Sequence, residues 1–246
     1  MARMRAGSPK FEDAMSSSSR VSVCVLLLTV LLATVHPTSA AVYKVTNAVP
    51  NTPGGKRFDQ VLGASNMRKV LQDAANFCRG KAFSLSTPKQ IATVTLIVES
   101  FSGVAFTAGD TIHLSAEYVA GYNPGDSAAL RREITGVLYH ESAHVWQNGD
   151  KGSGQFFGGV IEGIADWVRL RSGFAAAHWT RQRGGNWWDG YETTAFFLDW
   201  IQINKKKNFV NLLNQKMGQA QWSNDFFRQI VGVSVDQLWV QYQNSI

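Results

Sequence analysis

Short β-branched and apolar runs dominate the first half of the chain, and such runs predict strands. Residues 43–47 and 93–101 are of this kind, and residues 103–121 hold two more runs around an Ala-Gly-Asp turn. Between the first two, apolar residues recur at helical spacing from Val61 to Cys78. This half of the chain is therefore expected to form a mixed sheet accompanied by helices.

The second half of the chain changes to helical spacing. Residues 126–149 predict one helix, with Asp126 as its N-cap and Asn148-Gly149 as its end. After a glycine-rich connector, residues 159–173 predict a second helix, and later helical stretches carry six of the eight tryptophans. Strands followed by helices predict an α+β fold, with an N-terminal mixed sheet, a central helix and a C-terminal helical lobe.

The N-terminus has the pattern of a secretory signal peptide. Arg20 precedes 15 mostly apolar residues, and small residues ending at Ala40 fit a cleavage site. The apolar run is short for a membrane span, and a signal anchor is the alternative interpretation. We expect residues 1–40 to be the signal peptide, with Met15 as an alternative start, and residues 41–246 to be a secreted domain without stable membrane association.

Charge and cysteine content narrow the choice of partners. The net charge is +6, and it falls to +4 without residues 1–40, which hold four Lys/Arg and two Asp/Glu. The basic residues are scattered apart from Lys205–Lys207, which predicts a solvated turn and no nucleic-acid partner. Because Cys24 lies in the predicted signal, Cys78 is the one remaining thiol, and we expect it to be a buried small hydrophobe. The sequence gives no indication of oligomeric state.

The candidate chemistry lies in the predicted helix 126–149. His140, Glu141 and His144 form an H-E-x-x-H sequence. Residues four apart differ by about 40° around a helix and about 6 Å along it, so the two imidazoles can converge on one metal ion. Zn²⁺ suits neutral imidazole nitrogens in tetrahedral geometry, and Glu141 would serve as general base toward its bound water. The pattern therefore predicts a zinc site on an active-site helix.

A third ligand must come from elsewhere, and two acids compete for the role. Glu162 lies four residues before Asp166, so Glu162 could bind the metal while Asp166 accepts the ring N–H of a ligating histidine. Surface ion pairs, for instance with Arg169, are the structural alternative for these two acids. Asp150, at the spacing of metzincin-type sites, is the other candidate ligand, but Gln147 stands where those sites use glycine.

Four longer segments extend the pattern beyond the H-E-x-x-H sequence. They are "GYNPGDSAALRREITGVLYHE", "HVWQNG", "IEGIADWVRLRSG" and "WWDGYETTAFFLDW". On these segments, most of residues 42–246 resembles the plant basic secretory proteins, a zincin-like peptidase family of plants and bacteria. The resemblance implies a secreted, zinc-dependent endopeptidase of the apoplast or cell wall with a role in plant defence. It also favours Glu162 over Asp150, because the family's recurring block is the E-G-I-A-D segment.

The resulting hypothesis is metal-assisted hydrolysis of a peptide or protein substrate. Glu141 would take a proton from the metal-bound water and pass it to the leaving amine. Tyr191 and His178 are candidate donors to the developing oxyanion. By analogy with zinc peptidases, the substrate would add to an edge strand such as 111–115. The alternatives are a non-catalytic, defence-related binding protein that keeps the zincin fold, and a membrane-anchored ectodomain.

Overall fold

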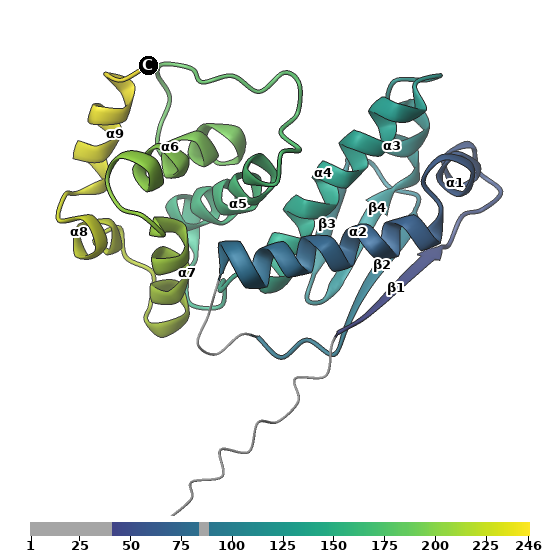
Figure 1. Ribbon diagram of the computed structural model, residues 1–246, viewed down its shortest axis with the longest axis horizontal. Coiled ribbons are helices and arrows are strands. Elements are labelled where there is room, and N and C mark those ends of the chain that lie inside the picture. The colour runs from purple at the N-terminus through teal and green to yellow at the C-terminus, as the bar shows by residue number, and fades with distance from the viewer. Residues whose placement is uncertain (1–40, 84–88) are drawn as a thin grey trace, which may run out of the picture. The chain divides into compact units, whose positions relative to one another are not determined.

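The computed structural model describes residues 41–83 and 89–246, whose helices and strands are labelled in Figure 1. The predicted signal peptide, residues 1–40, lies outside the described residues. Among the described helices, none combines the length and the apolar character of a membrane span.

A four-stranded mixed sheet forms the N-terminal part, as predicted. Its strands are β1 (Val42–Asn47), β2 (Thr93–Glu99), β3 (Ala105–Ala108) and β4 (Thr111–Ser115). Their order in the sheet is β1-β2-β4-β3, with the first two pairings parallel and the pairing of β4 with β3 antiparallel. Gly109 lies in the tight turn between β3 and β4, where its φ of 63° suits a residue without a side chain.

The expectation that residues 111–115 form an edge strand is wrong. These residues are β4, which is hydrogen-bonded to β2 on one side and to β3 on the other. The edge strand next to β4 is β3, which follows β4 in the sheet order although it precedes it in the sequence. Strand order depends on tertiary packing, and the hydrophobic pattern of two short neighbouring runs does not determine it.

Helical segments connect β1 to β2, because parallel neighbours need a crossover. These segments are α1 (Pro53–Arg57), a π-helical turn (Phe58–Leu62), α2 (Ala64–Phe77) and a second π-helical turn (Cys78–Ala82). α2 packs against β1 and against α4 (Ser127–Trp146), and α4 packs against β3 and β4. Both helices therefore cover the same face of the sheet (Figure 1).

Cys78 lies in the core between these elements. It is fully buried, and burial raises the pKa of its thiol. Because the thiolate is the reactive form, a buried thiol with a raised pKa is inert, which agrees with the expected role of a small hydrophobe.

The remaining elements of the described chain are helices, as the periodicity predicts. The remaining helices are α3 (Ala116–Gly121), α5 (Gly154–Arg171), α6 (Tyr191–Asn204), α7 (Phe209–Gln219), α8 (Phe226–Val231) and α9 (Val235–Gln243). In the C-terminal lobe, the ring of Phe197 contacts the rings of Phe227, Trp239 and Tyr242. Aromatic packing of this kind lets the lobe form without a disulfide.

α5 packs closely against α6 and against the segment that precedes α6, and two glycines of α5 allow this close contact. The contact fixes the position of α5 at the site described below. A Cβ atom on Gly163 would lie 2.3 Å from Cγ2 of Thr194, and one on Gly159 would lie 1.9 Å from the carbonyl oxygen of Trp188. Thr194 is itself fully buried, and its hydroxyl donates to the carbonyl oxygen of Trp187 and accepts from the N–H of Gly190. These hydrogen bonds fix the turn that leads into α6.

We expect Gly163→Ala to destabilise the protein by about 1–3 kcal/mol, because the added methyl group overpacks against the fully buried, hydrogen-bonded Thr194. The matched control is Gly158→Ala on the same helix, where an added Cβ meets nothing within 4 Å. Urea unfolding followed by circular dichroism measures both variants. The control should be as stable as the wild type or slightly more stable, since alanine favours helix. Equal stability of the two variants would contradict the packing argument.

Candidate metal centre

The H-E-x-x-H sequence lies in the C-terminal half of α4. The helix begins as predicted, because the carboxylate of Asp126 accepts a hydrogen bond of 2.8 Å from a backbone N–H of the first turn. Along the helix, His140 and Glu141 are 9% and 5% exposed, so the site starts from a mostly buried segment. A buried helix holds these side chains in place better than a surface loop would.

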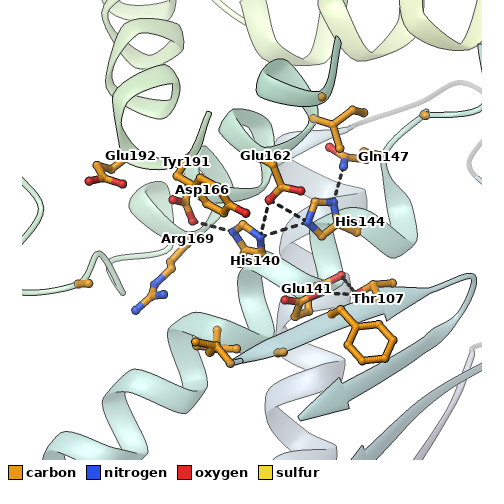
Figure 2. A pocket seen from close by; sticks show the side chains of 18 of the residues that line it. Thr107, His140, Glu141, His144, Gln147, Glu162, Asp166, Arg169, Tyr191 and Glu192 are labelled. Carbon is orange, nitrogen blue, oxygen red and sulfur yellow. Dashed lines mark hydrogen bonds and ion pairs between the residues drawn. The ribbon is translucent and has the colours of Figure 1, made fainter. Parts of the chain in front are cut away.

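Three side chains from α4 and α5 meet at one point (Figure 2). Nε2 of His140 lies 3.1 Å from Nε2 of His144, and Oε2 of Glu162 lies 3.2 Å from the first nitrogen and 3.6 Å from the second. Ligand atoms on one tetrahedral zinc, at about 2.0–2.2 Å each, are about 3.3–3.5 Å apart. The three atoms therefore have the spacing that a shared metal ion requires, and the donor set of two imidazoles and one carboxylate fits such an ion.

Asp166 holds His140 from the side opposite Glu162. The Nδ1–H of His140 donates to Oδ1 of Asp166 at 2.6 Å, and Asp166 is 3% exposed. This hydrogen bond leaves Nε2, the atom that faces Glu162 and His144, free to offer its lone pair to a metal. Glu162 and Asp166 thus divide two tasks, as their four-residue spacing on one helix face predicts.

The electrostatics of the cluster favour a cation at its centre. Burial lowers the pKa of His140, but hydrogen bonds with Asp166 and Glu162 outweigh burial and raise this pKa to about 10. Burial also raises the pKa of Glu162, but its contacts with His140 and His144 outweigh that effect and hold the pKa well below its usual range. Positive charge is therefore stabilised between these side chains, and a metal ion supplies such charge without a proton.

Glu141 points away from this cluster toward the edge strand (Figure 2). Its Oε2 accepts a hydrogen bond of 2.7 Å from the hydroxyl of Thr107, a residue of β3. The same hydroxyl lies 3.1 Å from the backbone carbonyl oxygen of Glu141. Glu141 lines the same pocket as His140 and His144 without joining the three converging ligand atoms.

The competing third ligand, Asp150, is placed differently. It is exposed and lines the same pocket, and its charge raises the pKa of Lys89, although burial of Lys89 has the larger, opposite effect. Among the described residues, the group able to hold a metal comprises His140, His144 and Glu162. The structure thus brings Glu162, and not Asp150, next to the two imidazoles.

Tyr191 and His178, the candidate oxyanion donors, both line the pocket. The ring of Tyr191 stacks on that of His140, with centroids 6.1 Å apart and an interplanar angle of 8°. Tyr191 is 54% exposed, its φ of 44° is in the left-handed region, and the negative charge of Glu162 raises the pKa of its phenol. His178 is exposed, and within the described part of the chain it has no hydrogen bond or ring contact with the cluster.

Comparison with known proteins bears on this geometry. A family described as "Peptidase of plants and bacteria" matches residues 38–242. The chain belongs to this family. A solved structure that it is similar to is an M1 zinc metallopeptidase from Deinococcus radiodurans, with 13% identity and a TM-score of 0.45. The match covers 72% of this chain and 43% of that one, so the chain spans less than half the length of that structure. Comparison with curated proteins gives no match.

In this member of the peptidases of plants and bacteria, two contacts at the site have no signal in the sequence. They are the hydrogen bond from Thr107 to Glu141 and a contact of 2.7 Å between the side-chain amide of Gln147 and Nδ1 of His144. Thr107 lies in the edge strand, whose position depends on tertiary packing. Gln147 is noticeable in the sequence as a replacement for glycine, but the spacing does not reveal what its side chain contacts.

The alternative of surface ion pairs with Arg169 is wrong for this site. Arg169 is buried, and its Nη2 pairs with Oε2 of Glu133 at 2.7 Å. Oε1 of Glu133 also accepts a hydrogen bond from Tyr118. This buried pair lines the pocket, which has a volume of about 980 Å³ and extends past His140, His144 and Glu162 between β3, α4 and α5.

We expect the protein to bind one divalent transition-metal ion at the cluster, with Co²⁺ as a spectroscopic probe. Glu162→Gln should weaken Co²⁺ binding by at least about tenfold, the lower end of the loss found for residues that only support a ligand. The matched control is Asp150→Asn, which should bind Co²⁺ like the wild type. Titration followed by visible absorption measures both affinities. Loss of binding in Asp150→Asn with retention in Glu162→Gln would reverse the assignment.

Proposed function

We propose that this chain is a zinc-dependent endopeptidase. The observation that carries the proposal is the convergence of two imidazole nitrogens and one carboxylate oxygen, with a second carboxylate, Glu141, lining the same pocket. Three protein ligands with a fourth position open to water are the pattern of catalytic zinc sites, whereas structural sites use four protein ligands. Membership in a peptidase family supports a peptide or protein as the substrate.

The proposed mechanism assigns a role to each side chain. Zinc bound at His140, His144 and Glu162 would polarise the scissile carbonyl group and acidify a water molecule. As the general base, Glu141 would accept a proton from the attacking water and deliver it to the leaving amine. Asp166 keeps His140 in the tautomer that binds metal through Nε2.

Two further features of the pocket suit a peptide substrate. Among the described strands, β3 lies at an edge of the sheet, where an extended peptide backbone can pair with it and add a strand. The phenol of Tyr191, whose ring covers His140, is the better candidate for a donor to the developing oxyanion. His178 remains the second candidate on the same pocket.

Secretion to the apoplast or cell wall and a role in defence are part of this proposal. The signal-like residues 20–40 support secretion, and the resemblance to the basic secretory proteins supports both. A defence-related binding protein that cleaves nothing is the alternative. Two features favour the enzyme: the general base is intact, and Thr107 donates a hydrogen bond to its carboxylate.

Glu141→Gln should lower peptide-bond cleavage by the zinc-loaded protein by about 10²- to 10⁴-fold, the usual contribution of a general base. Casein hydrolysis is the measurement, and zinc content is determined on the same samples. The variant should retain zinc, because Glu141 is not among the converging ligand atoms. Equal cleavage by variant and wild type would end the assignment of Glu141. Absence of cleavage by zinc-loaded wild type would favour the binding protein.

Thr107→Val should lower kcat by about tenfold and leave KM nearly unchanged, because a hydrogen bond to a charged group contributes about 1.5 kcal/mol or more. Valine keeps the shape of threonine but cannot donate to Glu141, so the carboxylate loses the contact that orients it. The control is Thr107→Ser, which keeps the hydroxyl and should recover most of kcat. If the valine and serine variants have the same kcat, Thr107 does not act through its hydroxyl.

A further inference from the structure

The two histidines of the cluster have different partners behind them. Nδ1 of His140 is held by the carboxylate of Asp166, which can only accept a hydrogen bond. Nδ1 of His144 is held by Gln147, whose neutral amide has both a donor and an acceptor atom. Asp166 therefore fixes the tautomer of the His140 ring. Gln147 can favour either tautomer of His144, and which one depends on whether the nitrogen or the oxygen of its amide faces Nδ1.

Gln147 is anchored by its backbone at the end of α4. It is the C-cap residue of the helix, and its N–H donates to the carbonyl oxygen of Ala143 at 2.7 Å. The residue is 2% exposed, and its side chain returns toward the helix to reach Nδ1 of His144 (Figure 2). The helix end thus delivers a buried amide to one atom of a proposed metal ligand.

The orientation of that amide decides what His144 can bind. When the amide nitrogen faces Nδ1, the ring nitrogen must accept, and in a neutral imidazole the proton then lies on Nε2. Nε2 is the atom that faces His140 and Glu162, so a proton there blocks metal binding. When the amide oxygen faces Nδ1, the ring donates from Nδ1–H, and Nε2 offers its lone pair to the centre.

The amide oxygen is available for the second arrangement. Oε1 of Gln147 is buried and meets no hydrogen-bond partner in the part of the chain that the structure describes, while Nε2 of the amide lies 2.7 Å from Nδ1. A half-turn of the terminal amide exchanges the two atoms without changing the space that the side chain fills. A buried acceptor without a partner is unfavourable, and the ring N–H of metal-bound His144 would give this oxygen one.

We propose that Gln147 is a positioning residue for the metal site, whose side-chain oxygen accepts from Nδ1–H of His144 and so keeps Nε2 free to bind the ion. This inference rests on the proposed metal site but not on peptide hydrolysis. Gln147 would then do for His144 what Asp166 does for His140. It also gives a role to Gln147 as the residue that stands where metzincin-type sites use a glycine after the second histidine.

The test uses the full chain and two variants of similar side-chain length. Gln147→Met fills the space without a good acceptor, and Gln147→Glu can accept but cannot donate when ionised. Zinc affinity is measured by competition with a chromophoric chelator. We expect Gln147→Met to bind zinc about 10- to 100-fold more weakly, the range for loss of a supporting hydrogen bond, and Gln147→Glu to bind at least as tightly as the wild type.

A second readout separates positioning from simple packing. Long-range ¹H–¹⁵N NMR of the imidazoles in the zinc-loaded wild type should find the proton of His144 on Nδ1. Thermal unfolding of the metal-free variants controls for loss of fold, because a purely structural role would lower stability without affecting which nitrogen carries the proton.

Two results would overturn the role of Gln147 alone. They are wild-type zinc affinity in Gln147→Met, and an unprotonated Nδ1 of His144 in the zinc-loaded protein. Failure of the wild type to bind zinc would overturn the proposed metal site and this inference with it. Zinc binding without casein cleavage would overturn the proposed function and leave the role of Gln147 to be decided by the affinities.

Discussion

The close approach of two imidazole nitrogens is the constraint on which the site depends. Nε2 of His140 and Nε2 of His144 are 3.1 Å apart, with an oxygen of Glu162 near both. Two lone pairs at this distance repel unless a proton or a cation lies between them. The four-residue spacing on a helix permits the approach, and the rest of the site has to supply negative charge and hold the rings in the correct tautomers.

Helix packing places that negative charge next to His140. Glu162 and Asp166 can reach His140 because α5 lies close to α4, and α5 is in turn held against α6 and its preceding turn at Gly159 and Gly163. Asp166 is nearly buried, and an isolated buried carboxylate is costly. Its hydrogen bond to His140 removes most of that cost, so the same contact stabilises the fold and orients a ligand.

How much could be predicted from the sequence depends on how far apart in the chain the interacting residues lie. The pairs His140/His144 and Glu162/Asp166 were predictable because helix geometry places residues four apart on one face, whatever surrounds them. The α+β class followed from the change of hydrophobic period along the chain. The edge position of β3 and the contact of Thr107 with Glu141 were not predictable, because both depend on how a hairpin packs against a helix distant in sequence.

Asp166, the partner of His140, is charged, whereas Gln147, the partner of His144, is neutral. The balance of charge at the site gives a physical reason for this difference. A divalent ion with Glu162 and Asp166 ionised is neutral overall, and Glu141 adds one negative charge that it loses when it takes a proton. An acid behind His144 as well would leave a further negative charge in a pocket that is already partly buried, where unbalanced charge is unfavourable. A neutral amide such as Gln147, once turned so that its oxygen faces Nδ1 of His144, would offer an acceptor to the ring without that charge. The asymmetry between His140 and His144 thus follows from the need to orient two ligands while keeping the proposed centre close to neutral.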